Sequence, residues 1–282
     1  MENQFESALG ALPPKTDVRD YKVAGAAQEK IELPKEYLVD FLPPVKNQGG
    51  VNSCVAHAVS SILEYHDRGE HNLSTNFIYG GQNSICGRDG QGMYLRDACK
   101  IVRKYGDALE EDCRGNTEVQ ACYDIADAAL ADEEIMSRAS RFKINSYADA
   151  NSVDDIKYAI YNYGPVLISV KWYKDYKVDK NGVMYTSETG DYGYHALMAY
   201  GWNETGFMIQ NSWGKLWGNK GRAILPYQYT VREAKAMVDA DNDDIIIPKR
   251  NKFLDIIYAH FFASPTFHLK SVSSTMLCIT PR

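Results

Sequence analysis

The chain has neither an excess of basic residues nor an apolar run long enough to cross a membrane. It carries 31 Lys and Arg residues against 37 Asp and Glu residues, a formal net charge of −6. Without a basic face to neutralise phosphates, we expect no nucleic-acid partner. The most apolar late stretch, residues 253–262, is interrupted by Asp255 and His260 and is too short for a transmembrane helix. We therefore expect no membrane partner.

An export signal is missing as well. Glu2 and Glu6 stand where a signal peptide needs basic residues, and no apolar region follows them. This start favours a cytoplasmic protein. The composition, 45% hydrophobic and 24% charged, is typical of a globular fold, and we expect a monomer.

The cysteines lack the spacing of a metal site. No pair is as close as in a zinc knuckle, so we predict no metal and no other cofactor. Because no signal directs the chain to an oxidising compartment, mostly free thiols are expected. The six cysteines are Cys54, Cys86, Cys99, Cys113, Cys122 and Cys278.

The chain changes character near its middle. Helical periodicity predicts helices at about 54–66, 95–105, 117–139 and 153–163. After Gly164-Pro165 the pattern predicts strands at 166–170, 182–186, 195–201, 207–211 and 222–226, and then a helical piece beyond Tyr229. We divide the chain into an N-terminal extension (1–35), a main domain (36–238) and an acidic linker with a tail (239–282). The acidic run at 239–244 lacks the Gly and Glu of a calcium loop, which favours a solvated linker.

Cys54 stands where a reactive thiol would be expected. It opens the first predicted helix, where the dipole and the unpaired amides should lower its pKa. A buried, inert cysteine is the usual alternative, and Cys54 alone would not exclude it. Gln48, in the Gly-rich loop just upstream, favours the reactive thiol over the inert cysteine. Its amide and the backbone N–H of Cys54 could form two donors to a developing oxyanion.

His195 and Asn211 are brought together by a predicted hairpin. His195 begins one apolar strand, and the turn at 203–206 folds the next strand back beside it, opposite residues 211–214. A histidine held by an amide oxygen and facing a thiol is the arrangement of a base and its orienter. Trp213 could shield that hydrogen bond from water, or be ordinary core. His57, one turn after Cys54, competes as the base, but we favour a packing role for it.

At these motifs the sequence resembles the papain-like cysteine peptidases. The matching segments are Pro44 to Gly49, Ser53-Cys54, Gly164-Pro165-Val166, His195-Ala196, Asn211 to Gly214 and Trp217-Gly218. The resemblance implies an α+β fold of two lobes, one helical and one an antiparallel β-barrel-like sheet, with the active site in the cleft between them. It also implies a peptide or protein substrate.

The resemblance assigns a role to each candidate residue. It makes Cys54 the nucleophile, His195 the acid/base, Asn211 the orienter and Gln48 the oxyanion donor of a cysteine endopeptidase. The residues implied for the side-chain pocket of the substrate are Gly92, Met93, Tyr94 and Ala196.

The sequence departs from the best-known members of this family. Where those have Cys-Gly-Ser-Cys-Trp, this chain has Val51-Asn52-Ser53-Cys54-Val55, which suggests a divergent microbial or viral branch. The extension 1–35 is short for an inhibitory propeptide, and we hypothesise that it lies near the cleft and holds the enzyme latent. Two alternatives to a general peptidase are a hydrolase of a non-protein amide or a single target, and an inactive peptide-binding module.

Overall fold

The computed structural model describes residues 9–15, 17, 20–23, 32–115 and 118–239. All of them belong to one structural unit, residues 1–248. The predicted tail lies outside the described residues, apart from Asp239. No helix in the described part of the chain is both long and apolar enough to span a membrane.

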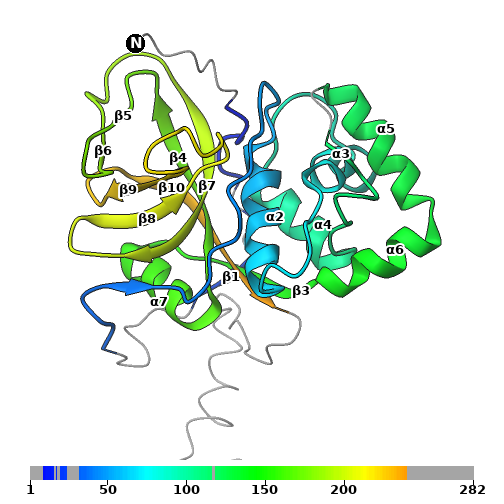
Figure 1. Cartoon of the computed structure of the whole chain (residues 1–282), viewed down its shortest axis with the longest axis horizontal. Helices are drawn as coiled ribbons and strands as arrows, with labels where there is room; N and C mark the ends of the chain where they lie inside the picture. The colour runs from blue at the N-terminus through cyan, green and yellow to red at the C-terminus, as the bar shows by residue number, and fades with distance from the viewer. Residues whose placement is uncertain (1–8, 16, 18–19, 24–31, 116–117, 240–282) are drawn as a thin grey trace, which may run out of the picture. The chain divides into compact units, whose positions relative to one another are not determined.

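The first half of the unit is a group of packed helices, mainly where the periodicity predicted them, but one helix, Thr75–Cys86, was not predicted (Figure 1). They are α2 (Cys54–His66), α3 (Thr75–Cys86), α4 (Leu95–Lys104), α5 (Val119–Leu130) and α6 (Glu133–Ala139). The single helix predicted at 117–139 is wrong. Asp132 interrupts it by accepting hydrogen bonds from the N–H groups of Glu134 and Ile135 at 2.9 and 3.0 Å, and thereby caps a separate α6.

The second half, joined by a short N-terminal strand, is built on one sheet with the spatial order β1-β3-β10-β4-β7-β8-β9; among the described strands of this sheet, only β1 and β3 pair in parallel. The strands are β1 (Tyr21–Lys22), β3 (Ile144–Asp149), β10 (Val231–Asp239), β4 (Val166–Tyr173), β7 (Tyr192–Trp202), β8 (Gly206–Gln210) and β9 (Arg222–Pro226). Two smaller pieces complete it: β2 (Tyr37–Leu38) pairs with β7, and β5 (Lys177–Val178) pairs with β6 (Met184–Tyr185). Helices and a mainly antiparallel sheet thus form the predicted α+β fold of two lobes.

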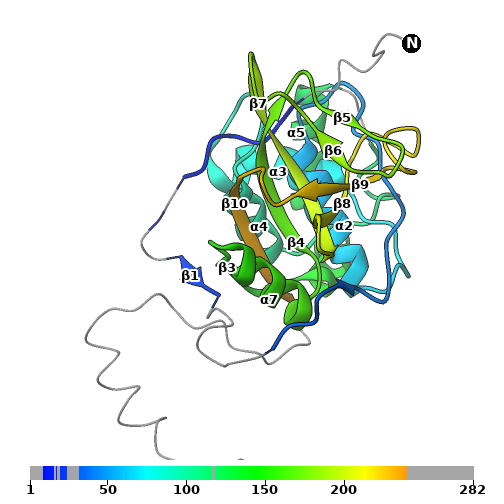
Figure 2. The ribbon, with the colours of Figure 1, turned by 90° about the vertical axis from the view of Figure 1, so that its left-hand side faces the viewer.

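One helix belongs to the sheet lobe. Ser152 and Asp155 form a reciprocal capping box at the start of α7 (Val153–Tyr163), the helix predicted at 153–163. Gly164 ends the helix at φ +88°, a conformation that favours glycine, and the chain turns into β4. Figure 2 shows α7 beside the long strands β4 and β10.

The helix predicted beyond Tyr229 is also wrong, because these residues form β10. The run Glu-Ala-Lys-Ala-Met favours a helix locally. The strand, however, is bonded on both sides, to β3 and β4, and residues 234–238 are all buried. Burial between two strands outweighs the local preference.

Helix α2 lies at the boundary between the two lobes (Figure 1). Residues 54 to 64 of this helix are all buried, which is unusual for a helix of a small domain. It packs against α3 and α4 on one side and against β7 and β4 on the other. Its first residue is therefore held beside the sheet.

Candidate active site

The sulfur of Cys54 lies against the strand that carries His195. Cys54 is the first residue of α2 and is fully buried. The backbone N–H of Ala196 in β7 donates to Cys54 Sγ at 3.4 Å. Since Ala196 follows His195 directly, the thiol and the imidazole come from adjoining positions on the two lobes.

In this structure the thiol is not activated. The sequence predicted a lowered pKa at the helix start, but burial raises the pKa of Cys54 to about 11. The backbone amides of Ala196, Gly10, Val55 and Ala11 stabilise the thiolate, but less than burial destabilises it. The expectation is therefore wrong for this state, in which Gly10 and Ala11 cover the sulfur.

His195 is held by Asn211, as the predicted hairpin required. Nε2 of His195 lies 2.7 Å from Oδ1 of Asn211, and both residues are buried. An amide oxygen only accepts, so with this amide orientation Nε2 carries the proton and Nδ1 has a free lone pair. Nδ1 is buried and has no hydrogen-bond partner among the described residues. The nitrogen that would take a proton is thus unoccupied.

Burial also keeps the imidazole neutral. It lowers the pKa of His195 to about 4, while the hydrogen bond to Asn211 acts in the opposite direction. At pH 7 the thiol is therefore protonated and the imidazole neutral. This is the resting form of a thiol–imidazole pair rather than the charged form that attacks a carbonyl.

Trp213 covers the histidine. Its ring centre lies 4.7 Å from that of His195 with 35° between the ring planes, and its side chain is buried. The expected shielding of the His195–Asn211 hydrogen bond is consistent with this packing.

Gln48 is tied to the segment that carries Asn211. Its backbone N–H donates to the Ser212 carbonyl at 2.8 Å, and its Oε1 accepts from Ser212 Oγ at 2.5 Å. Its Nε2 donates to the Val51 carbonyl at 2.9 Å, in the loop that leads to Cys54. Because the Val51 carbonyl only accepts, it identifies Nε2 as the donor end of the amide and holds it at the start of α2, while Ser212 holds the other end.

His57 does not contact the thiol through any described hydrogen bond. Its Nδ1 bonds the Ser53 carbonyl at 3.0 Å and Ser53 Oγ at 3.2 Å, within the same turn. Burial lowers the pKa of His57 to about 4. These contacts agree with a packing role.

The N-terminal segment 9–15, here called the leader segment, runs between the two lobes over Cys54. On the helical side, Leu12 N–H donates to the Met93 carbonyl at 3.0 Å and Met93 N–H donates to the Gly10 carbonyl at 2.8 Å. On the sheet side, Ala11 N–H donates to the Tyr194 carbonyl at 3.2 Å. The segment thus joins both lobes through backbone hydrogen bonds.

The leader segment fits closely against the loop before Cys54. A Cβ on Gly10 would lie 2.0 Å from the carbonyl oxygen of Asn52, so only glycine allows this approach. On the sheet side, the Leu9 side chain packs directly against Gly193.

An acidic pair anchors the chain farther along. Asp17 forms an ion pair with Arg96 of α4 at 2.9 Å, and Asp20 forms another with Arg96 at 2.7 Å. Asp20 also pairs at 3.2 Å with Lys235, which is 2% exposed. We call Asp17, Asp20, Arg96 and Lys235 the carboxylate clasp. Next to it, β1 pairs with β3.

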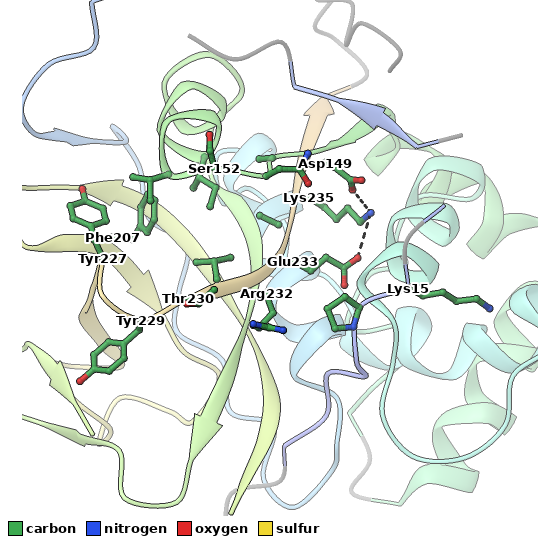
Figure 3. A pocket seen from close by; sticks show the side chains of 17 residues that line it. Lys15, Asp149, Ser152, Phe207, Tyr227, Tyr229, Thr230, Arg232, Glu233 and Lys235 are labelled. Atoms are coloured by element: carbon green, nitrogen blue, oxygen red, sulfur yellow. Dashed lines mark hydrogen bonds and ion pairs between the residues drawn. The ribbon is translucent and has the colours of Figure 1, made fainter. Parts of the chain in front are cut away.

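A hollow of about 290 Å³ separates the leader segment from the sheet lobe near the clasp. Pro14 and Lys15 line it on one side and β10 lines it on the other (Figure 3). Lys235 pairs at its wall with Asp149 and Glu233.

The residues implied for substrate binding all border the leader segment. Met93 bonds it through both backbone groups, and Ala196 bonds the sulfur beneath it. Gly92 packs against Leu12, and the Tyr94 ring lies 5.6 Å from the ammonium of Lys15. The leader segment therefore occupies the strip where the resemblance placed the substrate.

Among the described residues, one group has the composition of a metal site. The ligand atoms of Asp67, Glu70 and His71 lie within 4.8 Å of one another. Asp67 already accepts hydrogen bonds from the backbone and ring of His71, which closes the turn after α2. This group lies at the other end of α2 from Cys54.

Two contributors to the site were missed by the sequence analysis. Ser212 lies inside a quoted motif, and its hydroxyl was available as a signal. Trp172 lies 4.8 Å from His195 between ring centres; it falls just after the strand predicted at 166–170, and no motif pointed to this contact.

Residues 34–240 match the papain family of cysteine proteases. The match covers most of the chain and includes Cys54, His195 and Asn211. The chain belongs to the papain family of cysteine proteases.

Individual relatives are distant. An uncharacterized peptidase C1-like protein of Acanthamoeba polyphaga mimivirus is 26% identical over 66% of this chain and 65% of its own length. A cathepsin B-like cysteine proteinase of Caenorhabditis elegans is 26% identical over 63% of this chain and 55% of its own. The chain thus spans less than two thirds of these relatives. The viral relative agrees with the predicted branch.

The crystal structure of xylellain, a cysteine protease from Xylella fastidiosa, has a similar fold. It superposes with a TM-score of 0.69 and 21% identity, covering 85% of this chain and 99% of that one.

Proposed function

We propose that the protein is a cysteine endopeptidase in which Cys54 forms an acyl-enzyme. His195 Nδ1 takes the thiol proton, and the thiolate attacks the peptide carbonyl. Gln48 Nε2 and the Cys54 amide donate to the oxyanion. His195 then protonates the leaving amine and afterwards activates the water that releases the acyl group. The hydrogen bond that leaves His195 Nδ1 open is the observation that best supports this assignment.

The path of the leader segment supports cleavage inside a chain. It passes over Cys54 with backbone bonds on both lobes and continues on both sides of Ala11. The space over the thiol therefore accommodates the interior of an extended chain rather than only its end.

We also propose that the leader segment holds the enzyme latent, within an N-terminal extension of residues 1–35 and ahead of a peptidase domain of residues 36–238. It fills the strip where a substrate would bind, and it buries the thiol, which favours the protonated form.

The Gly10→Val variant of the full chain tests both proposals. A valine Cβ cannot lie against the Asn52 carbonyl, so the leader segment should leave the site. We expect hydrolysis of a protein substrate to rise at least about tenfold, the effect of ~1.4 kcal/mol on the closed-to-open equilibrium. Pro14→Ala, which changes no paired residue, is the matched control.

Peptides with both ends blocked test the site of cleavage. An endopeptidase cuts them internally, and mass spectrometry identifies the fragments. Equal activity of wild type and Gly10→Val would contradict latency. Activity only on free ends would contradict endopeptidase action, and inert variants would favour a peptide-binding module.

A further inference from the structure

Trp172 is placed to act on the proposed base from the neighbouring strand. In the β4–β7 pairing, Val170 lies opposite His195 and Trp172 lies opposite Gly193. Trp172 and His195 are therefore diagonal neighbours on the same face of the sheet. Their ring centres are 4.8 Å apart, with the planes at 70°.

Three rings meet at this point. Trp172 also lies 4.9 Å from Trp213, and Trp213 lies 4.7 Å from His195. Each ring thus contacts the other two. The two indoles meet the imidazole at different angles, 70° and 35°, so together they limit its rotation in more than one direction.

The hydrogen bond to Asn211 does not provide this restraint alone. It holds Nε2, but Nδ1 has no hydrogen-bond partner in the described structure. A ring held at one atom can still swing, and the position of Nδ1 relative to Cys54 would change. Packing against the ring is what fixes the nitrogen that must take the proton.

Trp172 also separates His195 from an outer hollow. A hollow of about 580 Å³ is lined by Trp172, Tyr176, Leu216 and Trp217, among others. Leu216 is 90% exposed, so this hollow faces solvent, whereas His195 is completely buried. The indole of Trp172, 6% exposed, stands between the two.

We propose that Trp172 is a positioning residue that fixes the His195 ring toward Cys54 and keeps water from the outer hollow away from it. This inference rests on the proposed function only for its effect on hydrolysis. The effect on the ring itself can be measured without any activity.

The first test is an NMR titration of His195 in the full chain. Burial lowers the pKa of His195 to about 4, and water admitted by Trp172→Ala should raise it toward its ordinary value. The substitution leaves in place the titratable neighbours, His57 and the thiol of Cys54, which lies against Ala196. Trp172→Phe keeps an aromatic ring and should give a smaller shift.

Trp217→Ala is the matched control. Trp217 lines the same hollow and lies 6.1 Å from Trp172 and 6.0 Å from Trp213, and no ring contact joins it to His195 in the described structure. We expect its His195 titration to match that of wild type. An unchanged titration in a cooperatively folded Trp172→Ala protein would overturn the proposal, as would an equal shift in Trp217→Ala.

The second test is kinetic, in the Gly10→Val background. Trp172→Ala should lower kcat about tenfold or more with little change in KM, because ring misplacement affects the chemical step. Trp172→Phe should recover most of the loss. A shifted His195 titration with no hydrolysis in any variant would contradict the proposed function and leave the positioning role intact. A change confined to KM would contradict positioning.

Discussion

At the scale of single residues, the site depends on which nitrogen of His195 is free and on how the side-chain amide of Gln48 is held. Asn211 fixes the tautomer of His195, and Ser212 holds Gln48 through its carbonyl and its hydroxyl. Both partners belong to the same short segment after β8. One segment therefore aligns the proposed base and the proposed oxyanion donor.

Gln48→Ala should lower kcat by about 10²–10³-fold with a modest change in KM, the usual effect of losing one oxyanion donor.

His57→Ala should retain most activity, because His57 bonds only Ser53 in the described structure. Both variants are compared by steady-state kinetics in the Gly10→Val background. A loss in His57→Ala comparable to that in His195→Ala would overturn the assignment of the base.

The sequence was sufficient to predict the placement of these residues where it depends on local patterns. A helix start at Cys54 and a hairpin that joins His195 to Asn211 follow from periodicity and turn residues. The raised pKa of Cys54 could not be predicted, because residues far away in the chain bury the thiol. The Trp172 contact likewise depends on the register between β4 and β7.

At the scale of elements, α2 and β7 form the site by lying against each other, and the leader segment closes it. The leader is held by backbone bonds over Cys54, and the chain that follows it is anchored by the carboxylate clasp. The clasp is well shielded, since Asp20 is 3% and Arg96 15% exposed. Shielded charged hydrogen bonds contribute more than exposed ones.

Removing the clasp carboxylates should therefore loosen the leader. We expect the Asp17→Asn/Asp20→Asn variant of the full chain to hydrolyse a protein substrate about tenfold faster than wild type, a change equivalent to ~1.4 kcal/mol. Asp40→Asn is the matched control, because Asp40 pairs with Arg68 in an exposed ion pair at 2.8 Å. If Gly10→Val activates and the double variant does not, the leader is held by its contacts near Cys54 alone.

Elements also show where reading the sequence failed. Segment 231–239 has a helix-forming composition, and only its pairing with β3 and β4 makes it a strand. Lys235 is buried there beside Asp20 and Asp149, which are distant in sequence, as well as its near neighbour Glu233. No local pattern contains that information.

At the scale of the described unit, the two lobes supply complementary halves of the proposed reaction centre. The helical lobe provides Cys54 and the loop with Gln48, and the sheet lobe provides His195 and Asn211. The division into lobes was predictable from the change of periodicity after Gly164-Pro165. Their junction was not, because it is made by tertiary contacts between α2 and β7.

The central claim is that Cys54 becomes acylated with His195 as its base. The most direct measurement is acid quenching of the Gly10→Val chain during turnover of an activated peptide ester, followed by peptide mapping by mass spectrometry. We predict an acyl group on Cys54 in this chain, and none in its Cys54→Ala derivative. In the His195→Ala derivative, the acyl group should form at least about 100-fold more slowly. Acylation of another residue, or an equal rate without His195, would contradict the account.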